Sequence, residues 1–329
     1  MSFGDTIFAF GTGEGISSLA VLRVSGPNCS LVIEGMIGQA LVPRVASYRV
    51  ILDFVTGSVL DKGLVIWFPG PQSFTGEDCL EFHCHGSLAV KSAIYESLSR
   101  IDRCRIAEPG EFTRRAFLNG KMDLVAVEGL AELLEAKTEL QRARAVSMLD
   151  GTLSAKADSW RSRILVLYSQ VAACIDFPDE GDVSQGVLDS VAERCEFLAV
   201  EMENAVARSR YGEIVRSGFN VAICGMTNAG KSSLLNALAR RDVSIVSDIA
   251  GTTRDLVELE LDLGGMLVRV VDSAGLRDAE DAVEIMGIAR SIEAAGRADL
   301  VLWLSPAGGD GTVDPKIQDV AAEVVVVQS

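Results

Sequence analysis

A glycine-rich turn in the second half of the chain, Gly225–Ser233 (GMTNAGKSS), fits the pattern G-x-x-x-x-G-K-[ST]. The apolar run 219–224 before it predicts a buried strand, and the run 232–239 after it predicts a helix. A strand, a turn and a helix in this order direct several backbone N–H groups and the positive end of the helix dipole at one point. Lys231 can then reach the β- and γ-phosphates of a nucleotide, and the Ser232 hydroxyl can bind Mg²⁺. The sequence therefore predicts an α/β domain with a phosphate-binding loop.

Two further segments extend the prediction from nucleotide binding to hydrolysis. Asp272–Gly275 (DSAG) follows the apolar run 267–271, so its carboxylate lies at a predicted strand end, where it can hold the Mg²⁺ shell through water. Between this segment and the turn lies Ser247–Asp255 (SDIAGTTRD), which contains the pair Thr252 and Thr253. A hydroxyl of such a loop can complete the Mg²⁺ shell when a triphosphate is bound. The three segments together predict a GTPase, although Ser247–Asp255 alone could be an ordinary polar turn.

The side chain that orients the hydrolytic water is not obvious from these segments. Many small GTPases place a glutamine directly after the D-x-x-G glycine, but this chain has Leu276 there. The nearby polar residues are Arg277, Glu280, Asp281 and Glu284. The charge that develops in the transition state also requires a cation, which can be an arginine or a metal ion.

Several blocks of the N-terminal half, taken with these three loops, match one known family. They are Asp5–Ile7, Val21–Pro27, Ser73–Glu81, His85–Gly86 and Pro109–Leu124. With these blocks and the loops in order, the chain resembles the MnmE (TrmE) family of tRNA-modification GTPases over its full length. Thr227 and Ser273 depart mildly from the family pattern, which has Pro and Thr at these places.

The resemblance implies a GTP site that is built by the three loops. Its residues would be Asn228, Ala229, Gly230, Lys231, Ser232, Ser233, Ser247, Asp248, Ile249, Ala250, Gly251, Thr252, Thr253, Asp272, Ser273, Ala274 and Gly275. Within this set, Ser232 and Thr253 match the Mg²⁺ ligands. A K⁺ ion that replaces an arginine would be held by Asn228, Ser247, Ile249 and Thr252. The catalytic residues would be Lys231, Asp272 and Glu284, and Glu284 would help to orient the water.

A second site is implied in the N-terminal domain. Arg23, Glu81 and Lys121 match the family positions that bind 5-formyl-tetrahydrofolate at a dimer interface. A guanidinium, a carboxylate and an ammonium group suit a ligand with a pterin ring and a glutamate tail. Composition alone gives these three residues no role, so unspecific surface charge remains the alternative.

The function that the resemblance implies is a K⁺-stimulated GTP hydrolase of the cytoplasm. It would act as a homodimer with the FAD-dependent protein MnmG and install an aminomethyl-type group at C5 of the wobble uridine of tRNA. One alternative is a ribosome-assembly GTPase, which would share the GTPase loops but lack the blocks at 73–81 and 109–117. Another is a folate-binding dimer that does not hydrolyse GTP.

Composition limits the partners and the environment. The formal net charge is −16, which argues against a broad basic tract that grips nucleic acid, so tRNA would bind through a local patch or a partner. The seven cysteines form no C-x-x-C pair, as is typical of a reduced cytosolic protein. No basic signal region starts the chain, and no apolar run reaches the roughly 18 residues of a membrane span. These features predict a cytoplasmic protein without a membrane segment.

The fold class expected for the chain is multidomain. Residues 1–120 predict an α+β dimerisation and folate-binding domain, residues 121–218 a helical domain, and residues 219–329 an α/β P-loop GTPase domain. The last domain reads as incomplete, because no N-K-x-D motif follows the predicted strand at 324–327. The preference for guanine therefore rests on the resemblance, and the chain reads as C-terminally truncated, without the family's C-x-G-K motif.

Two other patterns give weaker predictions. The glycines of Gly11–Gly15 suggest a dinucleotide-binding motif, but the third glycine does not fit the G-x-G-x-x-G spacing, and a strand-like run follows where this motif has a helix. His83 and His85 with Cys79 invite a zinc reading, but the chain has only these two histidines and no second ligand pair. Packing roles are favoured for both segments.

Overall fold

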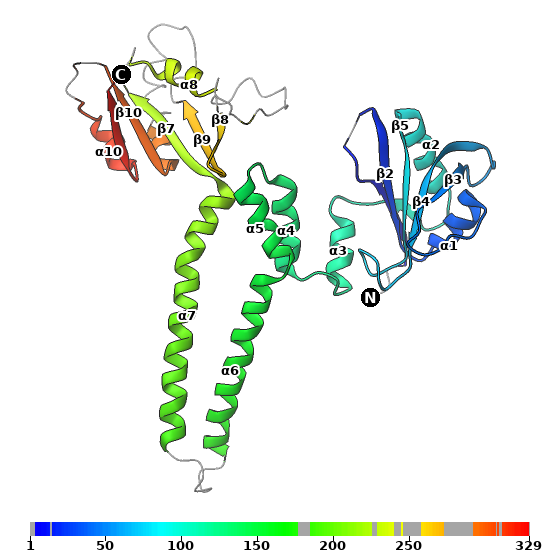
Figure 1. Ribbon diagram of the computed structural model, residues 1–329, viewed down its shortest axis with the longest axis horizontal. Helices are drawn as coiled ribbons and strands as arrows, with labels where there is room; N and C mark the ends of the chain where they lie inside the picture. The colour runs from blue at the N-terminus through cyan, green and yellow to red at the C-terminus, as the bar shows by residue number, and fades with distance from the viewer. Residues whose placement is uncertain are drawn as a thin grey trace. The chain divides into compact units, whose positions relative to one another are not determined.

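The computed structural model describes residues 4–13, 15–176, 185–225, 229–239, 245, 258–272, 292–306, 308 and 311–328. Contacts divide the chain into two compact units, Met1–Val127 and Glu128–Ser329. Figure 1 shows the helices and strands of each unit with their labels.

The first unit is built on a six-stranded sheet with the order β3-β4-β5-β2-β1-β6. The strands are β1 (Thr6–Phe10), β2 (Ser17–Ser25), β3 (Ser47–Leu52), β4 (Val59–Phe68), β5 (Cys79–Gly86) and β6 (Cys104–Ile106). All neighbours are antiparallel except β1 and β6. The helical segments are α1 (Cys29–Val32), η1 (Ile33–Ile37), α2 (Leu88–Ser99) and α3 (Glu111–Leu118).

Alternation along the central strands places the core on one face of this sheet. Leu22 and Val24 of β2, and Leu80 and Phe82 of β5, are fully buried, whereas the residues between them point to the other face because successive strand side chains alternate. Ile94 and Leu98 of α2 join the same core. The opposite face is therefore free to carry polar side chains, and it includes Arg23, Glu81 and His83.

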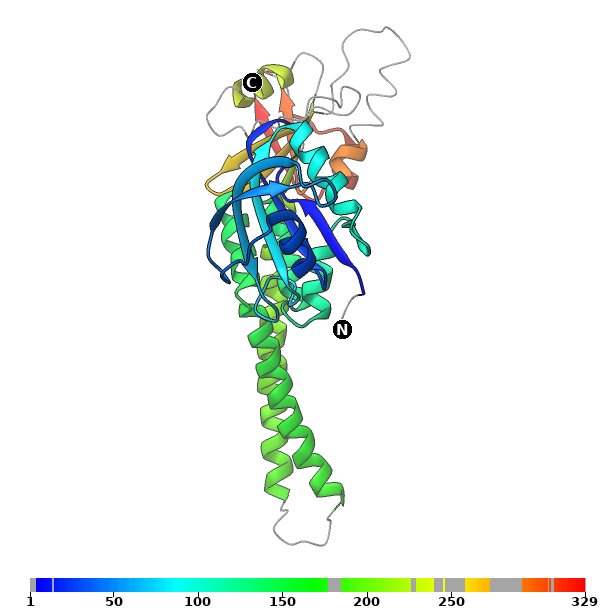
Figure 2. The ribbon, with the colours of Figure 1, turned by 90° about the vertical axis from the view of Figure 1, so that its right-hand side faces the viewer.

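The second unit begins with helices. These are α4 (Leu124–Glu135, which starts in the first unit), α5 (Glu139–Leu149), α6 (Thr152–Asp176) and α7 (Gln185–Ser217). Figures 1 and 2 both show α6 and α7 side by side. Leu167 of α6 packs between them with Val191 and Leu198 of α7, as the apolar spacing in this region predicts. These helices lie in the range 121–218, for which the sequence predicts a helical domain, and α7 ends at Ser217.

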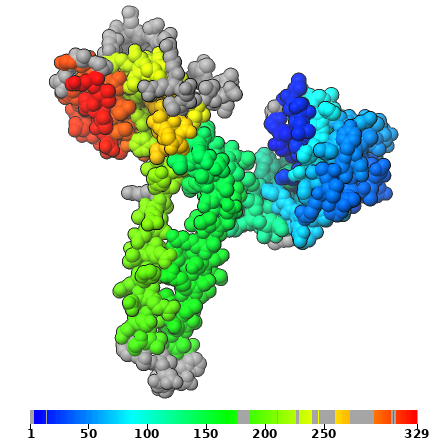
Figure 3. Space-filling view, viewed as in Figure 1, coloured from blue at the N-terminus to red at the C-terminus, as the bar shows by residue number. Residues whose placement is uncertain are grey.

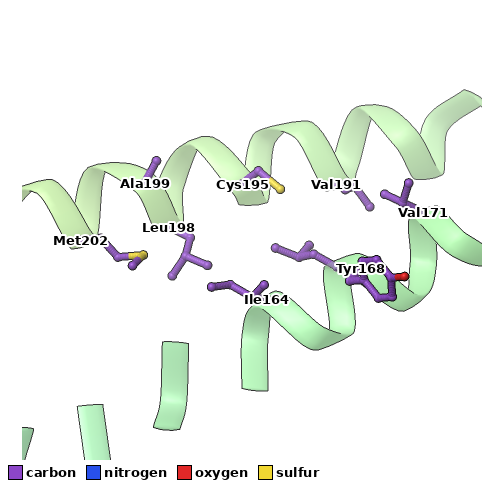
Figure 4. A pocket seen from close by; sticks show the side chains of 9 residues that line it. Ile164, Tyr168, Val171, Val191, Cys195, Leu198, Ala199 and Met202 are labelled. Atoms are coloured by element: carbon purple, nitrogen blue, oxygen red, sulfur yellow. The ribbon is translucent and has the colours of Figure 1, made fainter. Parts of the chain in front are cut away.

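An apolar groove runs between α6 and α7 (Figure 4). It is lined by Ile164, Leu167, Tyr168, Val171, Val191, Cys195, Leu198, Ala199 and Met202. Tyr168 and Phe197 are largely exposed on these helices, and Figure 3 shows the space-filling surface of both helices in green.

The rest of the second unit is a five-stranded sheet with the order β11-β10-β7-β9-β8. Its strands are β7 (Phe219–Gly225), β8 (Glu258–Leu263), β9 (Met266–Asp272), β10 (Leu300–Ser305) and β11 (Val324–Gln328). The helices are α8 (Lys231–Ala239), α10 (Pro315–Val320) and residues 292–297. Only β8 runs antiparallel to its neighbour.

The central strand β7 is buried on both faces, as parallel sheets with helices on both sides require. Val221 and Ile223 pack on one side with Leu235 of α8, and Ala222 and Cys224 pack on the other with Ala295. This explains why the sequence there is a continuous apolar run. Near the end of β8, Lys137 Nζ lies 2.6 Å from Glu260 Oε2 and ties the segment before α5 to this sheet.

Candidate functional site

The turn between β7 and α8 depends on two glycines. Gly225 has φ +141, and a Cβ built on it would lie 2.2 Å from the Leu304 carbonyl oxygen of β10. Gly230 has φ +83, a conformation that other residues rarely adopt, and it directly precedes α8. The strand and the helix expected on either side of the turn are both confirmed.

Lys231 is the first residue of α8, and its side chain folds back over the turn. Its Nζ donates a hydrogen bond to the Gly225 carbonyl at 2.8 Å, and the residue is half-buried. Ala229 is buried, while Ser232 and Ser233 are exposed on the first turn of α8. The ammonium group therefore lies beside the helix N-terminus, where an anionic phosphate is favoured by the dipole and by unpaired backbone N–H groups.

Asp272 is the last residue of β9, the strand beside β7. Its backbone is in parallel register with Ile223, two residues before Gly225. The carboxyl ends of parallel strands meet at one edge of a sheet, which is where ligands bind in open α/β folds. The structure thus brings Asp272 to the edge that carries the turn and Lys231.

The remaining predicted GTPase residues lie outside the described part of the chain. They are Asn228, Ser247, Asp248, Ile249, Ala250, Gly251, Thr252, Thr253, Ser273, Ala274, Gly275 and Glu284. Their roles stay predictions. The residues that are described nevertheless fit a nucleotide with Mg²⁺, because Lys231 and Ser232 are the first two residues of α8, at the helix N-terminus where phosphate oxygens are favoured.

In the first unit, Arg23 and Glu81 form a direct pair on the free face of the sheet. They lie opposite each other on β2 and β5, and Glu81 Oε1 accepts hydrogen bonds from Arg23 Nη2 at 2.8 Å and Nε at 3.1 Å. The next side chain on that face, His83, has a buried Nε2 that forms no hydrogen bond with the described residues and lies 3.8 Å from Glu81 Oε2. A ligand that bonds to this nitrogen would satisfy it.

Two aromatic rings flank the guanidinium of Arg23. Its Cζ lies 4.8 Å from the ring centroid of Phe74 and 5.8 Å from that of Phe112. The stem of Lys121 packs against Gly76, two residues after Phe74, because a Cβ on Gly76 would lie 3.2 Å from Lys121 Cγ. Cation–π contacts and apolar walls of this kind suit a planar ring with acidic groups. Neither phenylalanine was among the predicted site residues, although Phe74 lies in the block Ser73–Glu81 and Phe112 in the block Pro109–Leu124.

The first unit also contains a buried ionic network around Arg115. The sequence did not predict it. Arg115 of α3 is only 1% exposed, and its guanidinium lies 2.8 Å from Asp5, 3.0 Å from Glu111 and 3.1 Å from Glu77. Arg105 adds contacts of 2.6 Å to Asp5 and 2.7 Å to Glu111. Each of the three carboxylates thus has at least one guanidinium partner, and a buried ion without such a partner would be strongly destabilising.

This network shifts the pKa of its carboxyl groups. Hydrogen bonds from Arg105 lower the pKa of Glu111 to about 2, helped by the Glu108 backbone and Arg115. Burial raises the pKa of Asp5, but the hydrogen bonds and charges of Arg105 and Arg115 outweigh this effect, so the pKa lies below its usual value. Both groups are therefore more acidic in the folded chain than in the unfolded chain.

We expect the first unit to lose stability in acid through Glu111. A depressed pKa contributes stability that is present above the unfolded value of 4.5 and is lost as the pH falls toward about 2. The loss should amount to about 3 kcal/mol. Urea unfolding of wild type and Glu111→Gln at several pH values measures it. The difference between the two proteins should be largest near pH 7 and shrink toward pH 2, and a constant difference would contradict the assignment.

The two weaker motifs have structural roles in the described residues. The glycines of 11–15 connect β1 and β2, which are antiparallel neighbours, so no helix follows as a dinucleotide site requires. His85 Nδ1 lies 2.8 Å from Asp61 Oδ1. Among the described residues, no group of three or more His, Cys, Asp or Glu could hold a metal ion. All seven cysteines are free thiols.

The fold and the turn define a P-loop GTPase, and comparisons with known proteins agree. The family model described as 50S ribosome-binding GTPase matches residues 220–328, and the model of the GTP-binding protein TrmE N-terminus matches residues 6–121. The tRNA modification GTPase MnmE of Beijerinckia indica is 50% identical over 303 residues, which are 92% of this chain and 67% of that protein. MnmE of Methylobacterium sp. strain 4-46 is 48% identical and covers 95% of this chain and 72% of that protein.

The chain belongs to the family of the tRNA modification GTPase MnmE. It is a GTPase that binds GTP and Mg²⁺. Among solved structures, Aquifex aeolicus Era bound to GDP·AlF4⁻ is 28% identical over 32% of this chain and 38% of that chain, with a TM-score of 0.25. In the part of the chain that the structure describes, no helix is both long and apolar enough to cross a bilayer.

Proposed function

We propose that this tRNA modification GTPase is stimulated by K⁺ and acts with the FAD-dependent protein MnmG on the wobble uridine of tRNA. The product would carry an aminomethyl-type group at C5, with the carbon supplied by a folate. One observation carries the proposal. In a chain of this family, the Lys231 ammonium lies 2.8 Å from the Gly225 carbonyl, at the edge of the sheet where the strand that bears Asp272 also ends.

The proposed GTPase residues divide the work of hydrolysis. Backbone N–H groups at the start of α8 bind phosphate oxygens, and Lys231 neutralises charge on the β- and γ-phosphates. Ser232 would ligate Mg²⁺ directly, and Asp272 would hold the ion through water. When bound, Mg²⁺ supplies charge neutralisation between the β- and γ-phosphates. Thr253 would complete the Mg²⁺ shell, and Glu284 would orient the attacking water in place of the absent glutamine.

The K⁺ site rests on four residues outside the described ranges. Asn228, Ser247, Ile249 and Thr252 match the family positions that hold the ion beside the phosphates. A monovalent cation there would offset the charge that grows on the leaving oxygens. This role would otherwise fall to an arginine.

The folate proposal has more direct support in the described residues. Arg23 and Glu81 are paired, Lys121 lies along the same cluster, and Phe74 and Phe112 flank the guanidinium. The buried Nε2 of His83, which no group in the described part of the chain hydrogen-bonds, supports a ligand at this face. We propose that 5-formyl-tetrahydrofolate binds there and that two copies of the chain join at this domain.

The cell compartment and the rival functions follow from the same observations. A cytoplasmic location is consistent with seven free thiols. The match of residues 6–121 to the TrmE N-terminus disfavours a ribosome-assembly GTPase, which would lack these blocks. A folate-binding dimer that does not hydrolyse GTP remains as an outcome of the experiment that follows.

GTP turnover in KCl and in NaCl, at equal ionic strength, tests the hydrolytic proposal. We expect turnover at least about 10-fold faster in KCl, because one cation in the dry site offsets charge that water cannot screen. Asn228→Ala should remove the difference between the two salts and largely retain nucleotide affinity, measured with a fluorescent GDP analogue. Equal rates for wild type in both salts would refute the K⁺ site, and no turnover in either salt would favour the folate-binding dimer.

A further inference from the structure

The segment 73–78, here called the Phe74 loop, is the second part of the connection from β4 to β5 in the first unit, and buried polar contacts hold it. Ser25 Oγ lies 2.7 Å from Thr75 Oγ1 and donates a hydrogen bond of 2.9 Å to Glu77 Oε2. Ser25 and Thr75 are both fully buried. A loop on the surface is normally more mobile than the strands that it connects. The buried hydrogen bonds of Ser25 with Thr75 and Glu77 therefore indicate that the position of this loop matters.

Glu77 connects the Phe74 loop to the ionic network of Arg115. Its Oε2 lies 3.1 Å from Arg115 Nη1, and Arg115 also binds Asp5 and Glu111. Asp5 precedes β1 and Glu111 begins α3, so Glu77 is the carboxylate of this group that lies on the loop. Its charge therefore fixes the loop to the interior of the domain.

The Phe74 loop contacts two of the three proposed folate-binding residues. Phe74 stacks on the guanidinium of Arg23, and Gly76 packs under the stem of Lys121. Asn119 Nδ2 donates a hydrogen bond of 2.7 Å to the Thr75 carbonyl, which holds the end of α3 and the start of the Lys121 segment against the loop. Arg23 and Lys121 are 98 positions apart in the sequence, and the loop bridges them.

We propose that Glu77 is a positioning residue for the folate site. It does not need to touch the ligand: through Arg115 and Ser25 it fixes the Phe74 loop, and the loop sets Phe74 and Lys121 around the Arg23–Glu81 pair. The inference rests on the proposed folate function. Small displacements of groups that surround a ligand cost large factors in binding, which is why a site needs a fixed supporting layer.

The test compares two isosteric substitutions that each remove one carboxylate from Arg115. Glu77→Gln alters the partner on the loop, and Asp5→Asn alters a partner that lies away from it. Binding of 5-formyl-tetrahydrofolate to the full chain is measured by isothermal titration calorimetry. We expect Glu77→Gln to weaken affinity about 10-fold and Asp5→Asn to change it less than about 2-fold, although both variants lower the melting temperature.

Hydrogen exchange gives a readout that does not depend on the ligand. Glu77→Gln should speed amide exchange within residues 73–78, whereas Asp5→Asn should leave that peptide unchanged. The positioning role is overturned if the two variants weaken binding equally, if Glu77→Gln binds like wild type, or if exchange at 73–78 does not change. If wild type itself fails to bind the folate, the folate site is wrong and this role falls with it. If wild type binds the folate and Glu77→Gln binds it with the same affinity, the folate site stands and only the positioning role of Glu77 is refuted.

Discussion

Lys231→Ala is expected to reduce GTP turnover by a factor of at least about 10³, the largest effect of any single change proposed for this chain. The ammonium group is held beside the helix N-terminus by the Gly225 carbonyl, so it is already placed where the phosphate charge develops. Such fixed charge acts without reorganisation during the reaction. Steady-state phosphate release with saturating GTP, together with binding of a fluorescent GTP analogue, measures the loss in kcat and in affinity.

Lys316 provides a matched control for this substitution. It is an exposed lysine in the first turn of α10, another helix of the same sheet domain. Lys316→Ala removes the same charge from a similar position but should leave turnover within about 2-fold, since surface charges far from the chemistry contribute little. Comparable losses in the two variants would show that general electrostatics, and not the turn, governs hydrolysis.

Arg115→Met is expected to destabilise the first unit by about 3–5 kcal/mol. The substitution keeps much of the side-chain volume but removes the Arg115 cation from the largely buried Glu77 and leaves Asp5 and Glu111 with Arg105 as their cation. Removing one partner of a buried ionic group is costly because the remaining charges cannot regain their hydration. Urea unfolding at pH 7, followed by far-ultraviolet circular dichroism, measures the change in the free energy of unfolding.

Arg100→Met is the control for this second prediction. Arg100 also pairs with two carboxylates, Asp53 and Glu96, but 42% of its side chain is exposed to solvent. We expect a loss below about 1 kcal/mol, because exposed ion pairs are weak. A loss for Arg115→Met as small as the loss for Arg100→Met would mean that the network adds no stability beyond ordinary surface pairs.

The phosphate-binding turn was predictable from sequence because its determinants are local. The pattern from Gly225 to Lys231 specifies two unusual glycine conformations and a lysine, and the flanking runs have the apolar character of a buried strand and the spacing of a helix. β7 and α8 begin or end within one residue of the expected limits. The wider set of GTPase residues is not described, so their assignment still rests on the family resemblance.

The cluster in the first unit could not be derived in the same way. Arg23 and Glu81 meet because β2 and β5 pair in one particular register, and a shift of one residue would turn them to opposite faces. Arg115 and Asp5 are 110 positions apart. The motif around Arg115 was visible in the sequence, but its position inside the domain depends on sheet pairing and helix packing, which local patterns do not encode.

Gly225 has a further importance for how this protein can vary. Its missing side chain lets β7 and β10 approach each other, and its carbonyl is the group that restrains the Lys231 ammonium. The same residue is therefore needed for two separate reasons: the packing of β7 against β10, and the placement of the lysine that binds the nucleotide. A substitution there could not be rescued by adjusting either neighbour alone, so efforts to redesign the turn should treat this residue as fixed and introduce diversity around it.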